Sequence, residues 1–241
     1  MSLPKIDAPL YDLLLPLSNK KIKFRPFLVK EEKILLMAME SDDEKTIINS
    51  IKQILNNCCI TDIDIDIDDL PIIDIEYFFL NIQARSVSEI SELRYRCNNI
   101  IGEKECGNIM KYDINILEIV PKIPENFSNK IELTKTLGMV LKTPSFRLIE
   151  EKDENDGIDA TFKQIASCID YIYDADTIFY AKDHSEQELI EFIENLKRDQ
   201  FLKIKDFFNS IPKLEKDIDF CCSKCGYTEK IHVEGLHNFF V

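Results

Sequence analysis

The sequence predicts an α+β protein: a mainly helical domain with an N-terminal β-hairpin and a small, separate β module. Apolar residues recur at helical spacing through much of the chain, which predicts the helices. Alternating apolar and polar residues near both ends predict the strands. Two cysteine pairs, each between strand-like segments, predict the β module near residues 90–116 and 217–234.

The amino-acid composition limits the classes of function that the protein can have. The chain has 241 residues, 45% of them hydrophobic, which is enough for a sizeable core. Its formal net charge of -14 repels phosphate backbones, so we expect no nucleic-acid partner. It has only six glycines and no Gly-rich phosphate-binding motif. These features disfavour nucleotide-binding enzymes and nucleic-acid-binding proteins.

The cellular compartment follows from what the sequence lacks. No apolar run reaches the ~18 residues of a membrane span, so we expect no membrane partner. Asp7 and Asp12 interrupt the apolar N-terminal stretch, which is poorly suited to be a signal peptide. We therefore expect a cytosolic protein whose eight cysteines are reduced. In a cytosol, paired cysteines favour metal binding over disulfides.

The first segment, residues 1–87, is predicted to hold the hairpin and helices. The hairpin spans residues 10–27, with Ile22 and Phe24 facing inward. Two helices follow, the second starting at a capping box of Ser41 and Glu44. A short apolar helix then covers residues 74–86.

An acidic run, "TDIDIDIDDLP", lies at residues 61–71, before that helix. Alternating aspartates raise the possibility of a calcium loop. A calcium-binding EF-hand loop needs Gly at its sixth position and Glu at its twelfth, and neither is present here. We therefore interpret the run as a strand-like connection with aspartates outward.

The rest of the chain divides into two further segments. Residues 88–149 together with 213–241 form the strand-rich β module, with strands before Cys97, after Cys106 and on both sides of Cys222–Cys225. Residues 150–212 form a helical insertion, beginning with a charged linker at 150–157. Its first helix is expected to carry Phe162, Ile165, Ile169 and Tyr173 on one face, and its second to start at the capping box of Ser185 and Glu188.

The cysteine pairs predict a metal site. Cys222 and Cys225 form a C-x2-C step followed by Gly226, which is half of a zinc knuckle. Upstream, eight residues separate Cys97 from Cys106, and Gly107 follows Cys106. Glycine after the second cysteine fits a tight or left-handed turn. We expect these four cysteines to bind one structural zinc, which makes the β module zinc-ribbon-like and closes the loop over the helical insertion.

Other candidate ligands are weighed against these four. Cys221 adjoins Cys222 and replaces it as ligand if the register slips by one residue. Cys58 and Cys168 fall on apolar helical faces, which indicates core positions. His232 and His237 are possible ligands, although four cysteines already complete a tetrahedral set.

No catalytic motif is present. The sequence contains no G-x-S-x-G, no H-E-x-x-H and no recognisable arrangement of its three histidines. A zinc held by four thiolates leaves no open position for substrate. We therefore expect a protein that is not an enzyme.

Five segments resemble one family, the baseplate proteins of T-even-like contractile-tailed bacteriophages, in the same order along nearly the whole chain. They are "LYDLLLPLSNKKIKFRPFLVKEEKILLMAMES", "DIEYFFLNIQARSVSE", "CIDYIYDADTIFYAKDHSEQELIEFIENL", "QFLKIKDFFNSIPKLEKDI" and "VEGLHNFF". The resemblance implies a baseplate hub subunit or a hub assembly chaperone that acts through protein–protein contacts. It implies other tail or hub proteins as partners, with the tape measure protein as one candidate. It also implies that assembly takes place in the host bacterial cytoplasm. If the protein is a permanent component, the resemblance further implies that it stays in the tail baseplate of the virion.

A second function remains open at this point: a zinc-ribbon module of a transcription or RNA-processing complex. Its support is a group of basic residues near the cysteines, namely Arg94, Arg96, Lys104, Lys111, Lys224 and Lys230. The sequence gives neither the oligomeric state nor the exact partner. It also leaves open whether the aromatic residues of the helical insertion pack inside the protein or dock a partner.

Overall fold

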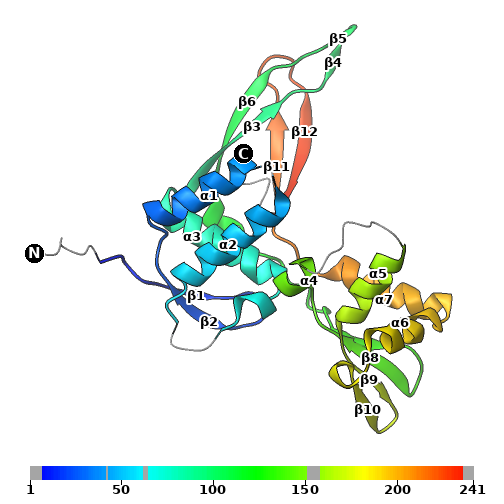
Figure 1. Ribbon diagram of the computed structural model, residues 1–241. Helices are drawn as coiled ribbons and strands as arrows, with labels where there is room; N and C mark the ends of the chain where they lie inside the picture. Colours follow the sequence, from blue (N-terminus) through cyan, green and yellow to red (C-terminus); the bar gives the residue numbers. More distant parts are fainter. Residues whose placement is uncertain (1–6, 42, 62–64, 151–157, 236–241) are drawn as a thin grey trace, which may run out of the picture. The chain divides into compact units, whose positions relative to one another are not determined.

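The computed structural model describes residues 7–41, 43–61, 65–150 and 158–235 (Figure 1). Its contacts group the chain into two compact units. Unit 1 contains residues 1–67, 73–122 and 213–241, and unit 2 contains residues 68–72 and 123–212. The three-segment division expected from the sequence stays a prediction.

The N-terminal hairpin of unit 1 is confirmed. Strand β1 (Tyr11–Leu14) pairs antiparallel with β2 (Lys21–Phe24). Ile22 and Phe24 are buried while the lysines between them are exposed, as the alternation predicts. The Phe24 ring meets the Phe78 ring edge-on at a centroid distance of 5.6 Å. This contact joins the hairpin to helix α3 (Ile72–Ser86).

Two helices lie between the hairpin and α3. They are α1 (Val29–Ser41) and α2 (Glu44–Cys58). The predicted capping box of Ser41 and Glu44 is wrong, because Ser41 ends α1. Asp43 is the N-cap of α2 instead, and its carboxylate accepts the backbone N–H of Thr46 at 2.9 Å.

Two buried carboxylates fix these elements. Asp74, at the start of α3, accepts the backbone N–H groups of Leu17 and Ser18 in the β1–β2 turn, both at 2.8 Å. Glu31, in the first turn of α1, pairs with Arg25 at 3.0 Å and accepts the N–H of Leu28. Each carboxylate satisfies donors that the chain reversal would otherwise leave unpaired.

The acidic run is only partly described, since Asp62 and Asp64 lie outside the described residues. Its end does not continue as a strand: Ile67–Asp69 form a 3₁₀ turn, η1. Asp69 pairs with Arg147 at 2.9 Å. The expected strand-like connection is therefore wrong over this part.

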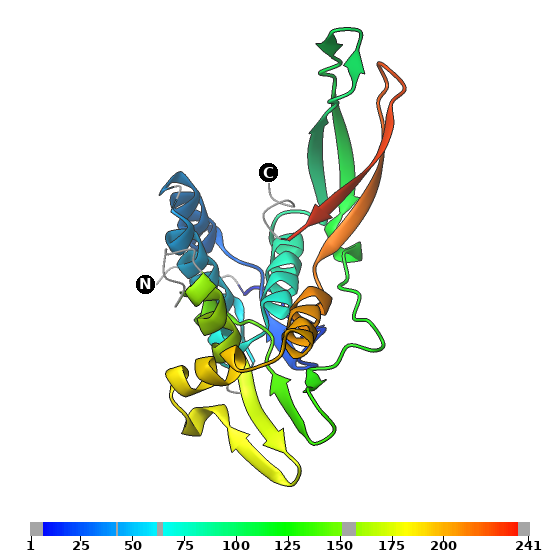
Figure 2. The same ribbon diagram turned by 90° about the vertical axis from the view of Figure 1, so that its right-hand side faces the viewer.

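Two long hairpins complete unit 1, and both are confirmed. Strand β3 (Ile90–Arg96) pairs with β6 (Ile109–Asn115), and β11 (Glu215–Cys221) pairs with β12 (Thr228–Glu234). They lie side by side in both views (Figures 1 and 2). A short 3₁₀ turn, η2 (Ile116–Glu118), follows β6. Beneath the hairpins, one face of α3 packs on apolar residues of both, including Ile114 and Val233.

Unit 2 is built on a four-stranded antiparallel sheet in the order β10-β9-β8-β7. The strands are β7 (Lys130–Glu132), β8 (Leu137–Leu141), β9 (Ile169–Asp174) and β10 (Thr177–Tyr180). The helices are α4 (Phe146–Glu150), α5 (Ile158–Ser167), α6 (Glu186–Glu194) and α7 (Arg198–Ser210), with a 3₁₀ turn, η3 (Ala181–Asp183), before α6. Helices α5, α6 and α7 gather on one side of the sheet (Figure 1).

Two expectations about this unit are wrong. The helix predicted through Phe162 and Tyr173 ends at Ser167, and the remaining residues form β9. The protein is therefore not mainly helical: twelve strands and seven α-helices among the described residues make it a mixed α+β fold. The capping box of Ser185 and Glu188 is confirmed.

The aromatic residues of the insertion pack within unit 2. Phe207 is buried, and Phe162 stacks on Phe201 at a centroid distance of 5.6 Å. Phe192 and Phe208 are partly buried against the same core of Met139, Leu141 and their neighbours. Helices and sheet thus hide most of the apolar surface whose role the sequence left open.

Candidate metal centre

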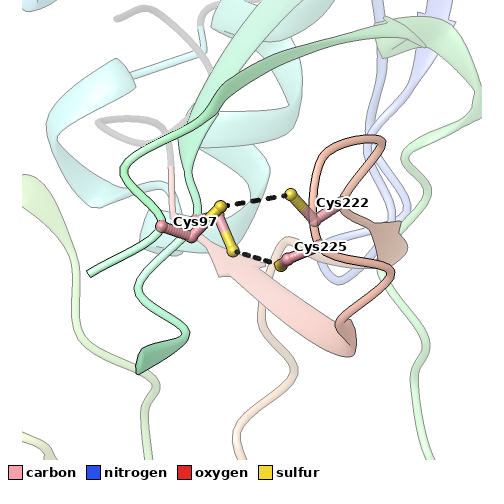
Figure 3. A group of neighbouring side chains, drawn as sticks. Cys97, Cys222 and Cys225 are labelled. Atoms are coloured by element: carbon pink, nitrogen blue, oxygen red, sulfur yellow. Dashed lines mark hydrogen bonds between the residues drawn. The ribbon is translucent and has the colours of Figure 1, made fainter. Parts of the chain in front are cut away.

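Four cysteines converge at the far ends of the two long hairpins of unit 1. Cys97 follows β3, Cys106 precedes β6, and Cys222 and Cys225 lie in the turn between β11 and β12. Their sulfur atoms all lie within 4.8 Å of one another, and they could hold a metal ion. Figure 3 shows the thiols of both turns pointing toward each other. The structure thus brings together all four of the cysteines selected from the sequence.

The two turns share one hydrogen-bond pattern. The N–H of Gly107 donates to the Cys97 carbonyl at 3.0 Å, and the N–H of Gly226 donates to the Cys222 carbonyl at 2.8 Å. Both glycines have a positive φ, 63° and 71°, in the left-handed region that glycine adopts at least cost. The predicted role of a glycine after each cysteine pair is therefore confirmed.

The spacing of eight between Cys97 and Cys106 has a simple structural origin. A small hairpin, β4 (Ile100–Ile101) with β5 (Lys104–Glu105), emerges between Asn99 and Cys106. The N–H of Cys106 donates to the Asn99 carbonyl at 2.8 Å, so the two ends of this hairpin lie together. Without residues 100–105 the segment would read C-N-N-C-G, which matches the C-S-K-C-G of the other turn. The site is thus a pair of C-x2-C knuckles, one of them interrupted by a hairpin.

Local hydrogen bonds oppose the cost of burying the thiols. Burial raises the pKa of the Cys97 thiol, although a hydrogen bond from the backbone N–H of Asn99 acts to lower it. For Cys222, burial also disfavours the thiolate, but the backbone N–H groups of Cys225 and Lys224 outweigh it and lower the pKa. Opposite shifts are expected where several thiols share one small space, because one thiolate disfavours the next.

Two sulfur–sulfur distances in the cluster match those of a tetrahedral thiolate site. The Cys97 and Cys225 sulfurs are 3.7 Å apart, and the Cys106 and Cys222 sulfurs are 3.8 Å apart. A tetrahedron with metal–sulfur bonds of about 2.3 Å has edges of about 3.8 Å, so these two distances are those of zinc ligands, and the other sulfur pairs lie within 4.8 Å. Four soft thiolates in this arrangement suit zinc or iron.

Two asparagines extend the site and were not anticipated. The side-chain amide of Asn108 lies 3.6 Å from the Cys222 sulfur, and that of Asn99 lies 3.6 Å from the Cys225 sulfur. Each of these amides belongs to the Cys97–Cys106 knuckle and approaches a thiol of the Cys222–Cys225 knuckle. Such outer contacts orient metal ligands. Their sequence signal is faint, because an asparagine two residues after a cysteine is common in turns.

The remaining candidate ligands lie elsewhere. Cys221 is exposed at the end of β11, whereas Cys222 is buried in the cluster. Cys58 and Cys168 are buried, and burial raises the pKa of Cys168 to about 12. His232 lies on β12 beside Asp217, with its Nδ1 2.8 Å from a carboxylate oxygen. His237 lies outside the described residues.

An aromatic layer supports the knuckles. The buried Phe220 ring packs edge-on against Tyr95 at a centroid distance of 4.7 Å, and the tilted Tyr112 ring lies 5.9 Å from Phe220. The Tyr95 hydroxyl reaches Glu229 of the opposite hairpin at 3.1 Å. The two hairpins are thus joined by an apolar contact next to the thiols.

Most basic residues around the knuckles already have local partners. Arg94 and Lys111 both pair with Glu92, Lys230 lies 3.8 Å from Asp217, and the Lys224 ammonium donates to the Cys106 carbonyl. Neighbouring carboxylates therefore offset much of the positive charge that a phosphate-binding face would need. This weakens the case for a transcription or RNA-processing module.

Comparisons with known proteins identify one family. The model of the family described as "T4 bacteriophage base plate protein" matches residues 8–241. No curated protein and no solved structure matches the chain. Among the described residues, no helix has the length and apolar character needed to cross a membrane.

Proposed function

We propose that this chain, which belongs to the family of T4 bacteriophage base plate proteins, acts in the hub of a phage tail baseplate through protein–protein contacts. The family supports a structural role in the baseplate. The assignment to the hub rests on the sequence resemblance given above. Other hub proteins would be the partners, and assembly would take place in the host cytoplasm before the tail is complete.

The metal centre has a structural role in this proposal. Cys97, Cys106, Cys222 and Cys225 hold one zinc ion, which fastens the β3–β6 hairpin to the β11–β12 hairpin. Four thiolates fill a tetrahedral zinc site and leave no position for substrate, which favours a staple over a catalyst. The spacing of the sulfur atoms supports zinc as the bound ion.

The observation that carries the contact role is the β4–β5 hairpin beyond the metal centre. Ile100 is 69% exposed and Ile101 is 51% exposed, although nearby thiols and aromatic rings are buried. Figures 1 and 2 both draw this hairpin at the far end of β3 and β6. Exposed isoleucines at the tip of a stapled module are suited to enter an apolar pocket of a hub partner, where a few buried side chains provide most of the affinity.

A double substitution tests this role. Ile100→Asp with Ile101→Asp should leave metal content and melting temperature unchanged, because both side chains are exposed. It should abolish rescue of a phage that lacks this gene, and it should remove hub proteins from a pull-down of infected cells. Retained rescue with wild-type recovery of hub proteins would contradict the contact role.

The matched control is Val120→Asp. Val120 is 53% exposed in the same unit but lies away from the knuckles, after η2. It changes an exposed apolar residue into the same acid and should keep rescue intact. Loss of rescue in both the double variant and Val120→Asp would indicate a general loss of solubility. It would count against a specific contact between the β4–β5 hairpin and a partner.

Two modes of action in the hub differ in where the protein ends up. A permanent component stays in the virion, whereas an assembly chaperone leaves before the tail is finished. The family description favours the first, and the net charge of -14 suits a soluble chaperone. Mass spectrometry of purified virions and of infected-cell lysate separates them: detection in virions at a level comparable to other hub proteins supports the permanent component.

A further inference from the structure

The four thiols form two close pairs, and each pair joins the upstream knuckle, at Cys97 and Cys106, to the downstream knuckle, at Cys222 and Cys225. Cys97 pairs with Cys225 at 3.7 Å, and Cys106 pairs with Cys222 at 3.8 Å. The dashed lines in Figure 3 cross from one turn to the other. The contacts around these two pairs show what holds the knuckles in place beside the thiols themselves.

Asn99 contacts both thiols of the first pair. Its backbone N–H donates to the Cys97 thiol, and its side-chain amide lies 3.6 Å from the Cys225 sulfur. Its backbone carbonyl accepts the N–H of Cys106 at 2.8 Å. Asn99 is therefore fixed at its backbone by the upstream knuckle while its side chain reaches the downstream knuckle.

Asn108 repeats this arrangement at the second pair. Its backbone N–H donates to the Cys106 thiol, and its side-chain amide lies 3.6 Å from the Cys222 sulfur. Its backbone carbonyl accepts the N–H of Cys97 at 2.8 Å. The same amide lies 3.3 Å from the Ser223 hydroxyl, so it has a second partner in the downstream knuckle. Together the two asparagines contact all four thiols.

The side-chain contacts distinguish these asparagines from the equivalent residue of the other turn. In the downstream knuckle, the backbone N–H of Lys224, two residues after Cys222, likewise donates to the Cys222 thiol. The Lys224 side chain, however, donates to the Cys106 carbonyl at 3.2 Å. The backbone bond is thus common to both turns, whereas the bond that crosses between knuckles to a sulfur depends on an asparagine amide.

An occupied metal centre has a use for these donors. Four thiolates outweigh the charge of one divalent cation, so the centre is anionic, and three of its four cysteines are buried. A buried charge costs free energy unless hydrogen bonds compensate it, and hydrogen bonds to an ionised acceptor are stronger than neutral ones. A metal-bound thiolate has no proton to donate, so the N–H end of each amide must face the sulfur.

We propose that Asn99 and Asn108 are positioning residues of the metal centre, that each bridges one pair of thiolates between the hairpins, and that their amides set how tightly the metal is held. The inference rests on the proposed zinc centre and goes beyond it, because neither residue is a ligand. Loss of an outer partner of a metal ligand typically weakens metal binding by about 10- to 100-fold. The amides would therefore keep the two hairpins joined where free zinc is scarce.

Competition with a chelator for zinc, on the full-length chain, tests the proposal. Leucine is similar in size to asparagine, lacks the amide and keeps the backbone bonds. Asn99→Leu and Asn108→Leu should each weaken zinc binding by about tenfold or more, and the double variant should bind more weakly than either. Asn98→Leu is the matched control, because Asn98 is an exposed residue of the same turn and its substitution should leave the affinity unchanged.

Cobalt spectroscopy separates an electronic role of the amides from a packing role. At saturating Co²⁺, the sulfur-to-cobalt charge-transfer band reports the thiolates of the loaded centre, whatever the affinity. A thiolate that has lost a hydrogen-bond donor gives up electron density more easily, so the band should move to lower energy in Asn99→Leu and Asn108→Leu and stay in place in Asn98→Leu. Alanine at the same two positions adds no apolar bulk and should give the same shift, which keeps the test valid if leucine disturbs the turn.

The outcomes separate this inference from the zinc centre itself. A wild type that binds zinc through four sulfur ligands, with leucine and alanine variants of unchanged affinity, would overturn the role of the asparagines and leave the zinc centre standing. Weaker binding with an unshifted cobalt band would also overturn it, because the asparagines would then act by packing alone. An equal loss of affinity in Asn98→Leu would do the same. A folded wild type that binds no metal would overturn both this inference and the zinc centre.

Discussion

The backbone N–H of Cys106 donates to the Asn99 carbonyl across 2.8 Å, so the chain leaves the upstream knuckle and returns to it at nearly the same point. Residues 100–105 form a hairpin between these two positions and contribute no ligand to the cluster. The four-cysteine cluster and the exposed apolar tip are therefore separable parts of one module. This separation makes the role of each part open to experiment.

Deleting residues 100–105 should leave the metal centre intact. The deletion joins Asn99 to Cys106 and produces a second C-x2-C-G knuckle, which needs only a small shift of the chain. We expect about one zinc per chain, as in a four-ligand structural site, and a melting temperature close to that of the wild type. Elemental analysis and calorimetry measure these two quantities. A variant that folds but has lost its metal would show that the hairpin helps to form the site.

Cys222→Ser should lower both metal content and stability. Cys222 is buried and its sulfur is 3.8 Å from that of Cys106, a residue 116 positions away in the chain. Loss of the metal removes a link across this long segment. The free energy of unfolding should therefore fall by several kcal/mol, which is a fraction of the binding free energy of a structural zinc. Elemental analysis with chemical denaturation would measure the change.

Two cysteine controls accompany that substitution. Cys168→Ser changes a buried cysteine outside the cluster and should leave metal content unchanged while it destabilises the core. Cys221→Ser changes an exposed neighbour of Cys222 and should affect neither quantity. If Cys221→Ser, and not Cys222→Ser, released the metal, the register of the knuckle would be wrong.

Asp74→Ala should destabilise unit 1 by about 2–4 kcal/mol. The Asp74 carboxylate is fully buried and accepts the N–H groups of Leu17 and Ser18. Its removal leaves two backbone donors without a partner, each at a cost of about 1–3 kcal/mol. Asp12→Ala is the control, because Asp12 is exposed on β1. Urea denaturation measures both, and equal stabilities would contradict the bridging role.

The contribution of His232 to stability should depend on pH. Its bond to Asp217, with further carboxylates at Glu215 and Glu234, raises the pKa of His232 above its ordinary value of 6.5. A raised pKa means that the folded state binds the proton more tightly, so the stabilisation is full below pH 6.5 and is lost as pH rises through the folded-state pKa. His232→Gln should therefore lower the free energy of unfolding at pH 6 and leave it nearly unchanged well above neutral pH. An equal loss at both pH values would contradict this.

Sequence reasoning selected the four cysteines that the structure brings together, because their signal is local. The C-x2-C-G step around Cys222 specifies a turn whose glycine adopts a left-handed conformation, and the flanking alternation specifies strands. The spacing between Cys97 and Cys106 was harder to interpret, since closure of the inserted hairpin depends on a bond between Asn99 and Cys106 that no spacing rule describes.

The segment at residues 129–145 suggested the β7–β8 pair of the unit 2 sheet, but β9 and β10 were missed for an identifiable reason. Phe162, Ile165, Ile169 and Tyr173 fit a helical period, yet the helix ends at Ser167 and Ile169 begins a strand. The turn to β10 lacks the glycine that usually marks a two-residue hairpin, because Ala175 takes a φ of 48° there. The runs of isoleucine and aromatic residues on both sides of Asp174–Asp176 were the available signal for strands.

The other features that sequence reasoning did not predict depend on tertiary contacts. Ser41 and Glu44 match the capping-box pattern, but α1 continues through Ser41 and Asp43 caps the next helix. Burial of Asp74 and Glu31 depends on chain reversals that a single helix pattern does not contain. Positions of this kind are set by long-range packing, which overrides local preference.

X-ray absorption at the zinc edge, on protein purified without a histidine tag, tests the central claim most directly. The claim is that Cys97, Cys106, Cys222 and Cys225 form a closed metal centre that holds the two long hairpins of unit 1 together. The account predicts stoichiometric zinc with four sulfur ligands at about 2.3 Å and no nitrogen or oxygen ligand. Protein that is folded yet free of metal, or zinc bound with nitrogen or oxygen in its first shell, would contradict it.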